Sequence, residues 1–162
     1  MATLAVVDLP AHIVDSLADT CAEKFEGHKV YKRAMRMSDE ARAISVVIDG
    51  WQHDFQDSPQ IGLVEPGWGF YSVRVQNMVK HQREEDGREI WNAQTALMRR
   101  VLYRDSDLRL RLLGTEQDVQ GSAERIKRLN VRRQNFMNSL VNSTFIYLCT
   151  SELTVDVEIT KL

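Results

Sequence analysis

The side chains most often used for catalysis or metal binding are scattered along this sequence. A zinc protease needs two histidines one helical turn apart with a glutamate between them, and none of the four histidines has such a neighbour. The tightest group of metal-ligand types is His53 with Asp54 and Asp57, and a metal there would need further ligands from elsewhere. The histidines are His12, His28, His53 and His81. We therefore expect no metal site.

Nucleophilic and phosphate-binding chemistry also lacks a motif. Cys21 falls on the apolar stripe of a predicted helix and Cys149 in an apolar strand region, so both are expected to be buried and inert. Their wide separation suits a reducing compartment. The glycines at positions 67 and 69 precede a predicted strand rather than a helix, unlike those of a phosphate-binding loop. We expect a non-enzymatic protein without a cofactor, while a site assembled from distant residues stays an open alternative.

Arginine gathers in one stretch of the chain, residues 99–133. The stretch holds ten basic and five acidic residues, and arginine suits bidentate pairing with carboxylate or phosphate groups. Three interpretations stay open: a solvated face with intramolecular ion pairs, a belt of salt bridges between subunits, or a surface along which DNA passes. The candidate contact residues are Arg125, Arg128, Arg132 and Arg133.

A second candidate region is residues 51–69, where hydrophobic periodicity disappears and prolines and glycines are frequent. A loop of this length is unusual in a compact domain and is often functional. Its aromatic side chains either fold back onto the body of the protein or anchor a neighbouring chain. These candidate contact residues are Trp51, Phe55 and Trp68.

The elements that position these side chains belong to one globular domain. The chain has 162 residues, of which 43% are hydrophobic and 27% charged, and a net charge of −2. These values predict a single domain over residues 1–162 whose core needs no metal or disulfide. The charge balance excludes a polybasic protein that grips nucleic acid over its whole surface. With no signal peptide and no apolar run near the roughly 20 residues of a spanning helix, we expect a cytoplasmic product without membrane contact.

Hydrophobic periodicity predicts two helices and several strands. Apolar residues at helical spacing indicate helices at residues 10–26 and 88–104. Strand patterns occupy residues 28–37, 43–48, 70–80, 124–133 and 144–159, the last being one long strand or a hairpin. Polar segments at 38–42, 82–87 and 135–143 are predicted as turns or loops, and 105–120 as a short strand or an irregular extension.

This order predicts an α+β fold, a two-layer sandwich of a mainly antiparallel sheet with two helices packed on one face. A long loop at about residues 51–69 and a C-terminal strand region at about 144–160 belong to the same domain. The strict alternation near the C-terminus indicates a sheet with one covered and one solvated face.

Four segments stand out in this order of elements: IVDSLAD at 13–19, AISVVI at 43–48, FYSVRV at 70–75 and SELTVDVEI at 151–159. With the order of elements, they resemble the tail terminator or tail-completion (neck) proteins of long-tailed bacteriophages. The likeness spans most of the chain and departs at residues 51–69 and 125–133.

The resemblance implies a structural virion protein, made in the host cytoplasm and located in the neck of the particle. Such proteins form a ring, usually six-fold, that caps the tail tube and joins it to the head connector. The implied partners are further copies of the chain, tail-tube and connector proteins, and DNA in passive contact within the channel. The alternative hypothesis is a small nucleic-acid-binding domain that uses residues 99–133.

Overall fold

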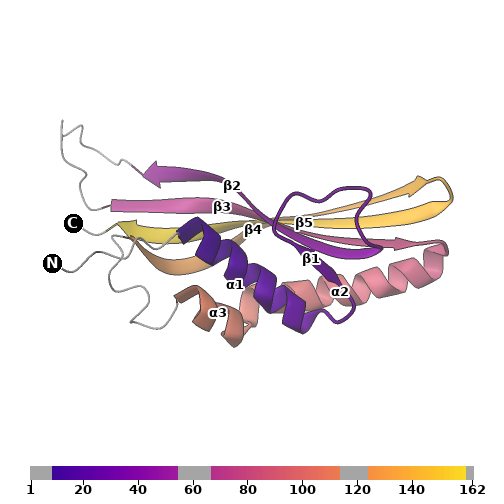
Figure 1. Cartoon of the computed structure of the whole chain (residues 1–162), viewed down its shortest axis with the longest axis horizontal. Coiled ribbons are helices and arrows are strands. Elements are labelled where there is room, and N and C mark those ends of the chain that lie inside the picture. The colour runs from indigo at the N-terminus through magenta and orange to yellow at the C-terminus, as the bar shows by residue number, and fades with distance from the viewer. Residues whose placement is uncertain (1–8, 55–66, 114–123, 160–162) are drawn as a thin grey trace.

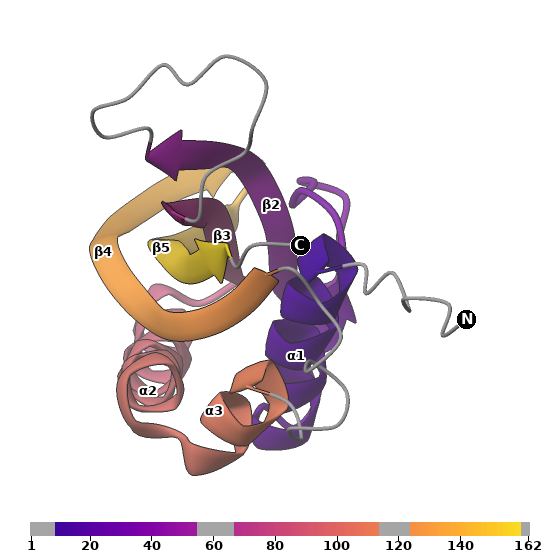
Figure 2. The same cartoon turned by 90° about the vertical axis from the view of Figure 1, so that its left-hand side faces the viewer.

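The computed structural model describes residues 9–54, 67–113 and 124–159. Within these ranges the chain forms, in order, α1 (Leu9–Lys24), β1 (Lys29–Tyr31), β2 (Arg42–Asp54), β3 (Gly67–His81), α2 (Glu84–Arg104), α3 (Ser106–Leu113), β4 (Glu124–Val141) and β5 (Thr144–Ile159). The strands make one five-stranded sheet in the order β1-β2-β3-β5-β4. The helices lie together on one side of this sheet (Figure 1, Figure 2). The predicted α+β sandwich is confirmed, with α3 as a helix that the sequence did not predict.

The sheet is mainly antiparallel, as predicted. Only the short β1 runs parallel to its neighbour β2 in the described part of the chain. β4 and β5 form a long hairpin closed by Asn142 and Ser143, whose φ angles of 49° and 63° fit a tight two-residue turn. The hairpin ends at the same end of the molecule as the start of α2 (Figure 1).

The main core lies between the helices and one face of the sheet. Alternate residues of the central strands point toward the helices, as the period of two in a strand requires. The predicted apolar stripe of α1 packs against them. Typical members are Ile13, Leu17 and Cys21 of α1 and Leu153, Val155 and Val157 of β5.

The connection between β1 and β2 covers part of the opposite sheet face. Met35 of this connection packs against a small cluster that includes Met78. The buried carboxylate of Asp39 accepts hydrogen bonds from the Arg33 guanidinium at 2.6 and 3.0 Å. Chiefly because of this contact, the pKa of Asp39 lies at about 2. The strand predicted at residues 28–37 therefore ends at Tyr31, where the chain turns into this connection.

The loop predicted at residues 51–69 is wrong at both ends. β2 continues through Asp54, and β3 begins at Gly67. A bulge between Ile48 and Gly50 shifts the register of β2 against β3, so the alternation that marks a strand breaks there. The part of the predicted loop between these strands lies outside the described residues.

The charged loop predicted at residues 82–87 is also wrong, because α2 begins at Glu84. The sequence predicted a loop here because Gly87 lies in the first turn of α2 and glycine is unfavourable inside helices. A Cβ at this position would lie 2.9 Å from His81 and from Tyr147. Glycine is therefore required where the helix approaches β3 and β5 closely.

Residues 105–120 were predicted as a strand or an irregular extension, and the described part forms α3 instead. The Asp105 carboxylate accepts a hydrogen bond from the Leu108 N–H at 2.9 Å and so caps the helix. Leu108 and Leu112, one turn apart, are both buried. The leucines at 108, 110 and 112 alternate as in a strand, but Leu108 and Leu112 are also four residues apart, as on one face of a helix. The cap by Asp105 favours the helix.

Candidate functional site

The arginines of β4 lie on the sheet face turned away from the helices, opposite the acids of β5. The register places Arg125 beside Glu158 and Arg128 beside Asp156. The Arg128 Nε donates to the Asp156 carboxylate, and Asn130 Nδ2 donates to the same oxygen at 3.0 Å. Part of the Arg-rich stretch is thus engaged in ion pairs within the chain.

Three further basic side chains of β4 also contact polar groups of the hairpin. These contacts join Lys127 to Glu158 (2.9 Å), Arg132 to Thr154 (3.1 Å) and Arg133 to Asn135 (2.9 Å). Of the three interpretations of the Arg-rich stretch, a solvated face with intramolecular pairs fits β4 best. Surface pairs of this kind add little stability individually.

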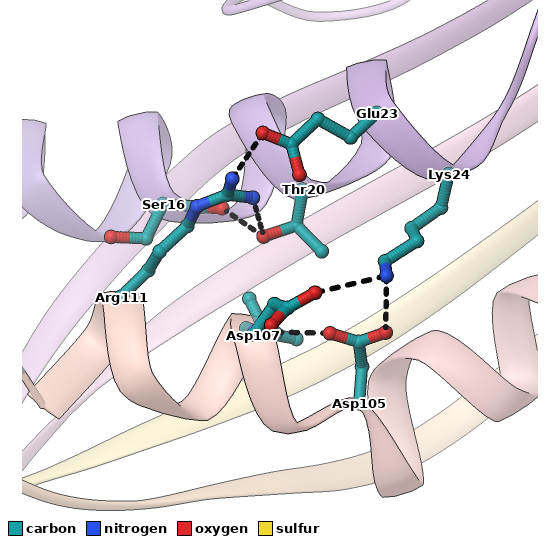
Figure 3. Close-up of polar contacts among 8 residues, drawn as sticks. Ser16, Thr20, Glu23, Lys24, Asp105, Asp107 and Arg111 are labelled. Atoms are coloured by element: carbon teal, nitrogen blue, oxygen red, sulfur yellow. Dashed lines mark hydrogen bonds and ion pairs between the residues drawn. The ribbon is translucent and has the colours of Figure 1, made fainter.

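Charged side chains also tie α3 to α1 (Figure 3). The Arg111 guanidinium donates to Thr20 Oγ1 at 2.9 Å and to the carboxylate of Glu23, which lies one turn further along α1. Lys24 Nζ lies 3.5 Å from Asp105 and 3.0 Å from Asp107. The hydrogen bond with Asp107 is the main cause of the raised pKa of Lys24. This network fixes α3 against α1 and so has a structural role.

The last turns of α2 carry three arginines that have no carboxylate partner among the described residues. They are Arg99, Arg100 and Arg104, and with Ala96 and Tyr103 they line a groove of about 370 Å³. Tyr103 is 48% exposed. The groove thus combines an exposed aromatic ring with three unpaired cations, and we call it the basic groove.

Trp51, a predicted docking residue, lies on β2 and packs on its own sheet. Its indole covers Gly69, where even an added Cβ would overlap the ring. The Trp51 and Tyr71 ring centroids are 4.5 Å apart. Of the two roles left open for the aromatic residues, folding back onto the body of the protein fits Trp51.

Trp68 lies on β3 and is 52% exposed. The register places it beside Glu158, which in turn lies beside Arg125. Two of the predicted contact residues, one from each candidate region, therefore lie in the same cross-strand row. The third aromatic candidate, Phe55, lies outside the described residues.

The end of the β4–β5 hairpin carries exposed apolar side chains that the sequence did not single out. Met137 is 63% and Leu140 62% exposed, and Phe136 and Val141 are also exposed. The register places Phe136 and Leu140 on the helix side of the sheet and the other two on the opposite side. We call these four residues the hairpin tip, and it is apolar on both faces.

The turn predicted at residues 135–143 is wrong except for its last two residues, because β4 extends to Val141. The segment was predicted as a turn because asparagine and serine are frequent in it, and the apolar residues between them were therefore not recognised as part of a strand. The signal that could have located the hairpin is the pair Asn142-Ser143, since asparagine tolerates the positive φ of a two-residue turn.

The acidic start of α2 lies next to the hairpin tip. The Tyr147 hydroxyl donates to the Glu84 carbonyl at 3.1 Å, and Glu84 and Leu140 line a common hollow of about 160 Å³. Glu85 and Glu89 on the exposed side of this helix start have no ion pair among the described residues. α2 is therefore acidic beside the hairpin tip and basic at its other end, the distribution that the helix dipole favours.

Within the described ranges, no three His, Cys, Asp or Glu side chains lie close enough to hold a metal ion. His53 and Asp54 lie at the end of β2, and Asp57 lies outside those ranges. Cys21 and Cys149 are free and buried, as expected. Burial raises the pKa of Cys21 to about 12 and also raises that of Cys149, so both thiols stay protonated near neutral pH. No helix in the described residues is both long and apolar enough to span a membrane.

No protein-family model matches the sequence, and no curated protein matches it significantly. The resemblance to tail terminators stays a prediction, and a functional assignment depends on the surfaces described above.

Proposed function

We propose that this chain is a structural subunit of the neck of a tailed bacteriophage, a tail terminator that acts by assembling into a ring. The ring, six-fold by resemblance, caps the tail tube and joins it to the head connector in the virion. The observation that carries the proposal is the hairpin tip, which exposes apolar side chains on both faces of a strand pair. Exposed apolar side chains gathered at one end of a hairpin, here interrupted only by Asn138 and Ser139, are the kind of surface that marks an interaction site.

The two edges of the sheet support ring assembly. At one edge β4 pairs only with β5 among the described residues, and at the other β1 pairs only with residues 43–45 of β2. The two exposed edges therefore differ in length and sequence. Different surfaces that meet head to tail form a ring when the rotation between neighbours closes, whereas a single self-complementary patch gives a dimer.

The experiment that tests the proposal is a measurement of particle mass, by analytical ultracentrifugation of the protein alone and by binding to purified tail tubes. We expect an oligomer of fixed size, alone or on the tube. The double variant Met137→Ser, Leu140→Ser should lose assembly while its circular dichroism spectrum is unchanged. Leu110→Ser is the matched control, because Leu110 is 68% exposed on α3, away from the tip.

A wild-type protein that stays monomeric at every concentration and binds no tail tube would contradict the proposal. Equal loss of assembly in the Leu110→Ser control would show that the effect of the tip variant is not specific to the hairpin.

A second candidate function is nucleic-acid binding through the basic groove. The specific observation in its favour is that Arg99, Arg100 and Arg104 lack carboxylate partners among the described residues. The arginines of β4 are weaker candidates, because their contacts within the hairpin already engage them.

Salt-dependent binding of duplex DNA, measured by fluorescence anisotropy, tests this second function. Alanine at positions 99, 100 and 104 should abolish binding. The matched control replaces Arg128, Arg132 and Arg133 with alanine and should retain it. Absence of binding by the wild type at low salt would exclude this function.

A further inference from the structure

We infer that the hairpin tip of one copy docks into the basic groove of a second copy of this chain. This inference rests on the ring proposed above and names the two surfaces that meet in it. Each surface is complete on one chain and lacks its complement there.

The docking element is the hairpin tip together with the start of α2. Met137 and Leu140 supply flexible and branched apolar side chains that are more than half exposed. Glu85 and Glu89 add two carboxylates without an ion pair in the described residues. Leu140 lies on the helix side of the sheet, beside Glu84 at the start of α2, and Met137 lies on the opposite side, so the carboxylates are on the same side of the sheet as Leu140. An apolar anchor with charged neighbours is typical of the centre and rim of an interface.

The receptor is the basic groove. Tyr103 offers an exposed aromatic ring, and the aliphatic stems of Arg99 and Arg100 can extend the apolar surface while their guanidinium groups stay at the rim. Arginine forms strong paired hydrogen bonds with carboxylates. Acids of the docking element and cations of the receptor thus complement each other in charge.

The two surfaces cannot meet within one chain. They occupy opposite ends of α2, which has 21 residues and therefore spans about 30 Å. The tip end of the molecule lies beside the start of this helix, along the long axis (Figure 1). Contact between tip and groove therefore requires another copy, joined head to tail, and repetition of that contact is the geometry that a ring needs.

A second copy fits the groove better than nucleic acid does. DNA would neutralise the arginines but would leave the hairpin tip and its neighbouring carboxylates exposed to water. A second copy covers both surfaces in one contact, which is why we assign the groove to the chain itself.

Reciprocal charge reversal tests the inference. The start variant is Glu85→Arg, Glu89→Arg, and the end variant is Arg99→Glu, Arg100→Glu. Each alone should weaken self-association about tenfold or more, because like charges then meet across the interface. An equimolar mixture of the two should restore assembly, since opposite charges face each other at every contact of an alternating ring with an even number of subunits. Glu26→Arg, Glu40→Arg is the control, with two exposed acids outside both surfaces.

Cross-linking gives a second readout that does not depend on charge reversal. The double variant Leu140→Cys, Tyr103→Cys should give a ladder of disulfide-linked oligomers under mild oxidation, because each copy links two neighbours. Either single variant should give no ladder, because its one new thiol faces Tyr103 or Leu140 of the neighbouring copy and not a second thiol. The native thiols are buried and do not compete.

The outcomes separate this inference from the proposed function. If the wild type assembles but both reversed variants assemble equally well and no ladder forms, the inference is wrong and the ring stands. If the wild type never assembles, with or without tail tubes, the proposed function fails as well. If the end variant loses DNA binding and keeps assembly, the groove is a nucleic-acid surface and the inference is overturned.

Discussion

The two halves of strand β4 differ in almost every respect. In the proximal half, residues 124–133, two bulges interrupt the pairing with β5, and arginine or lysine side chains contact acids across the hairpin. Its inward-facing residues Ile126, Leu129 and Val131 pack against the main core. Bulges and charged side chains are the usual devices that protect an exposed sheet edge from unwanted pairing.

In the distal half, residues 134–141, the register with β5 is regular and no bulge interrupts it. Four apolar side chains are exposed there on both faces of the strand, together with the polar side chains of Asn138 and Ser139. One strand therefore combines a protected edge with an unprotected one. The proximal half therefore contributes to the core, and the distal half is where we propose that a partner binds.

The largest expected difference between the halves is in stability. Leu153, which pairs with Val131 of the proximal half, is buried, and Leu153→Ala should lower the free energy of unfolding by about 2–5 kcal/mol. Leu140→Ala in the distal half should change it by no more than roughly 0.5 kcal/mol, because that side chain is exposed.

Equilibrium unfolding in urea, followed by tryptophan fluorescence, measures both variants. The protein must be dilute enough to be monomeric, since assembly would add stability that depends on concentration. Equal losses for the two variants would abolish the distinction between the halves.

A smaller effect is expected from the charged contacts of the proximal half. Asp156→Ala removes the acceptor shared by Arg128 and Asn130, and should lower the free energy of unfolding by about 1–2 kcal/mol. Glu152→Ala is the control, because Glu152 is exposed and lies opposite Arg133 without an ion pair among the described residues. The same urea titration measures both variants. If Asp156→Ala leaves the free energy of unfolding unchanged, these contacts do not contribute to stability.

Much of the fold was predictable wherever one period dominates a segment. The four-residue spacing of Ile13, Leu17 and Cys21 located α1, and the alternation from Leu153 to Ile159 located the end of β5. Both elements bury one face against the core, so burial and sequence pattern coincide.

The fold was less predictable where local geometry overrides the pattern. The bulge at Ile48 breaks the alternation of β2, and Gly87 lies inside a helix because a neighbouring ring leaves no room for a side chain. In both places, contacts with elements distant in the sequence decide the structure, and a single segment does not contain that information.

The candidate site was predictable in composition and not in arrangement. The sequence identified the basic residues, but the acid that engages Arg128 lies 28 residues away on another strand. The hairpin tip could not be predicted, because the sequence pattern does not distinguish exposed apolar residues such as Met137 and Leu140 from buried ones. That distinction depends on which parts of the sheet the helices cover.

The smallest effect concerns the turn that closes the distal half. Ser143 has a φ of 63°, a region that costs residues with a Cβ more than it costs glycine. Ser143→Gly should therefore raise the free energy of unfolding by about 0.5 kcal/mol, because relief of the turn outweighs the greater freedom of glycine in the unfolded chain. Ser139→Gly is the matched control, since Ser139 lies in the extended part of β4, where glycine should be destabilising. Urea unfolding again measures the change. Because the turn lies outside the hairpin tip, Ser143→Gly should leave assembly intact, and a loss of assembly would show that the turn itself is part of the contact.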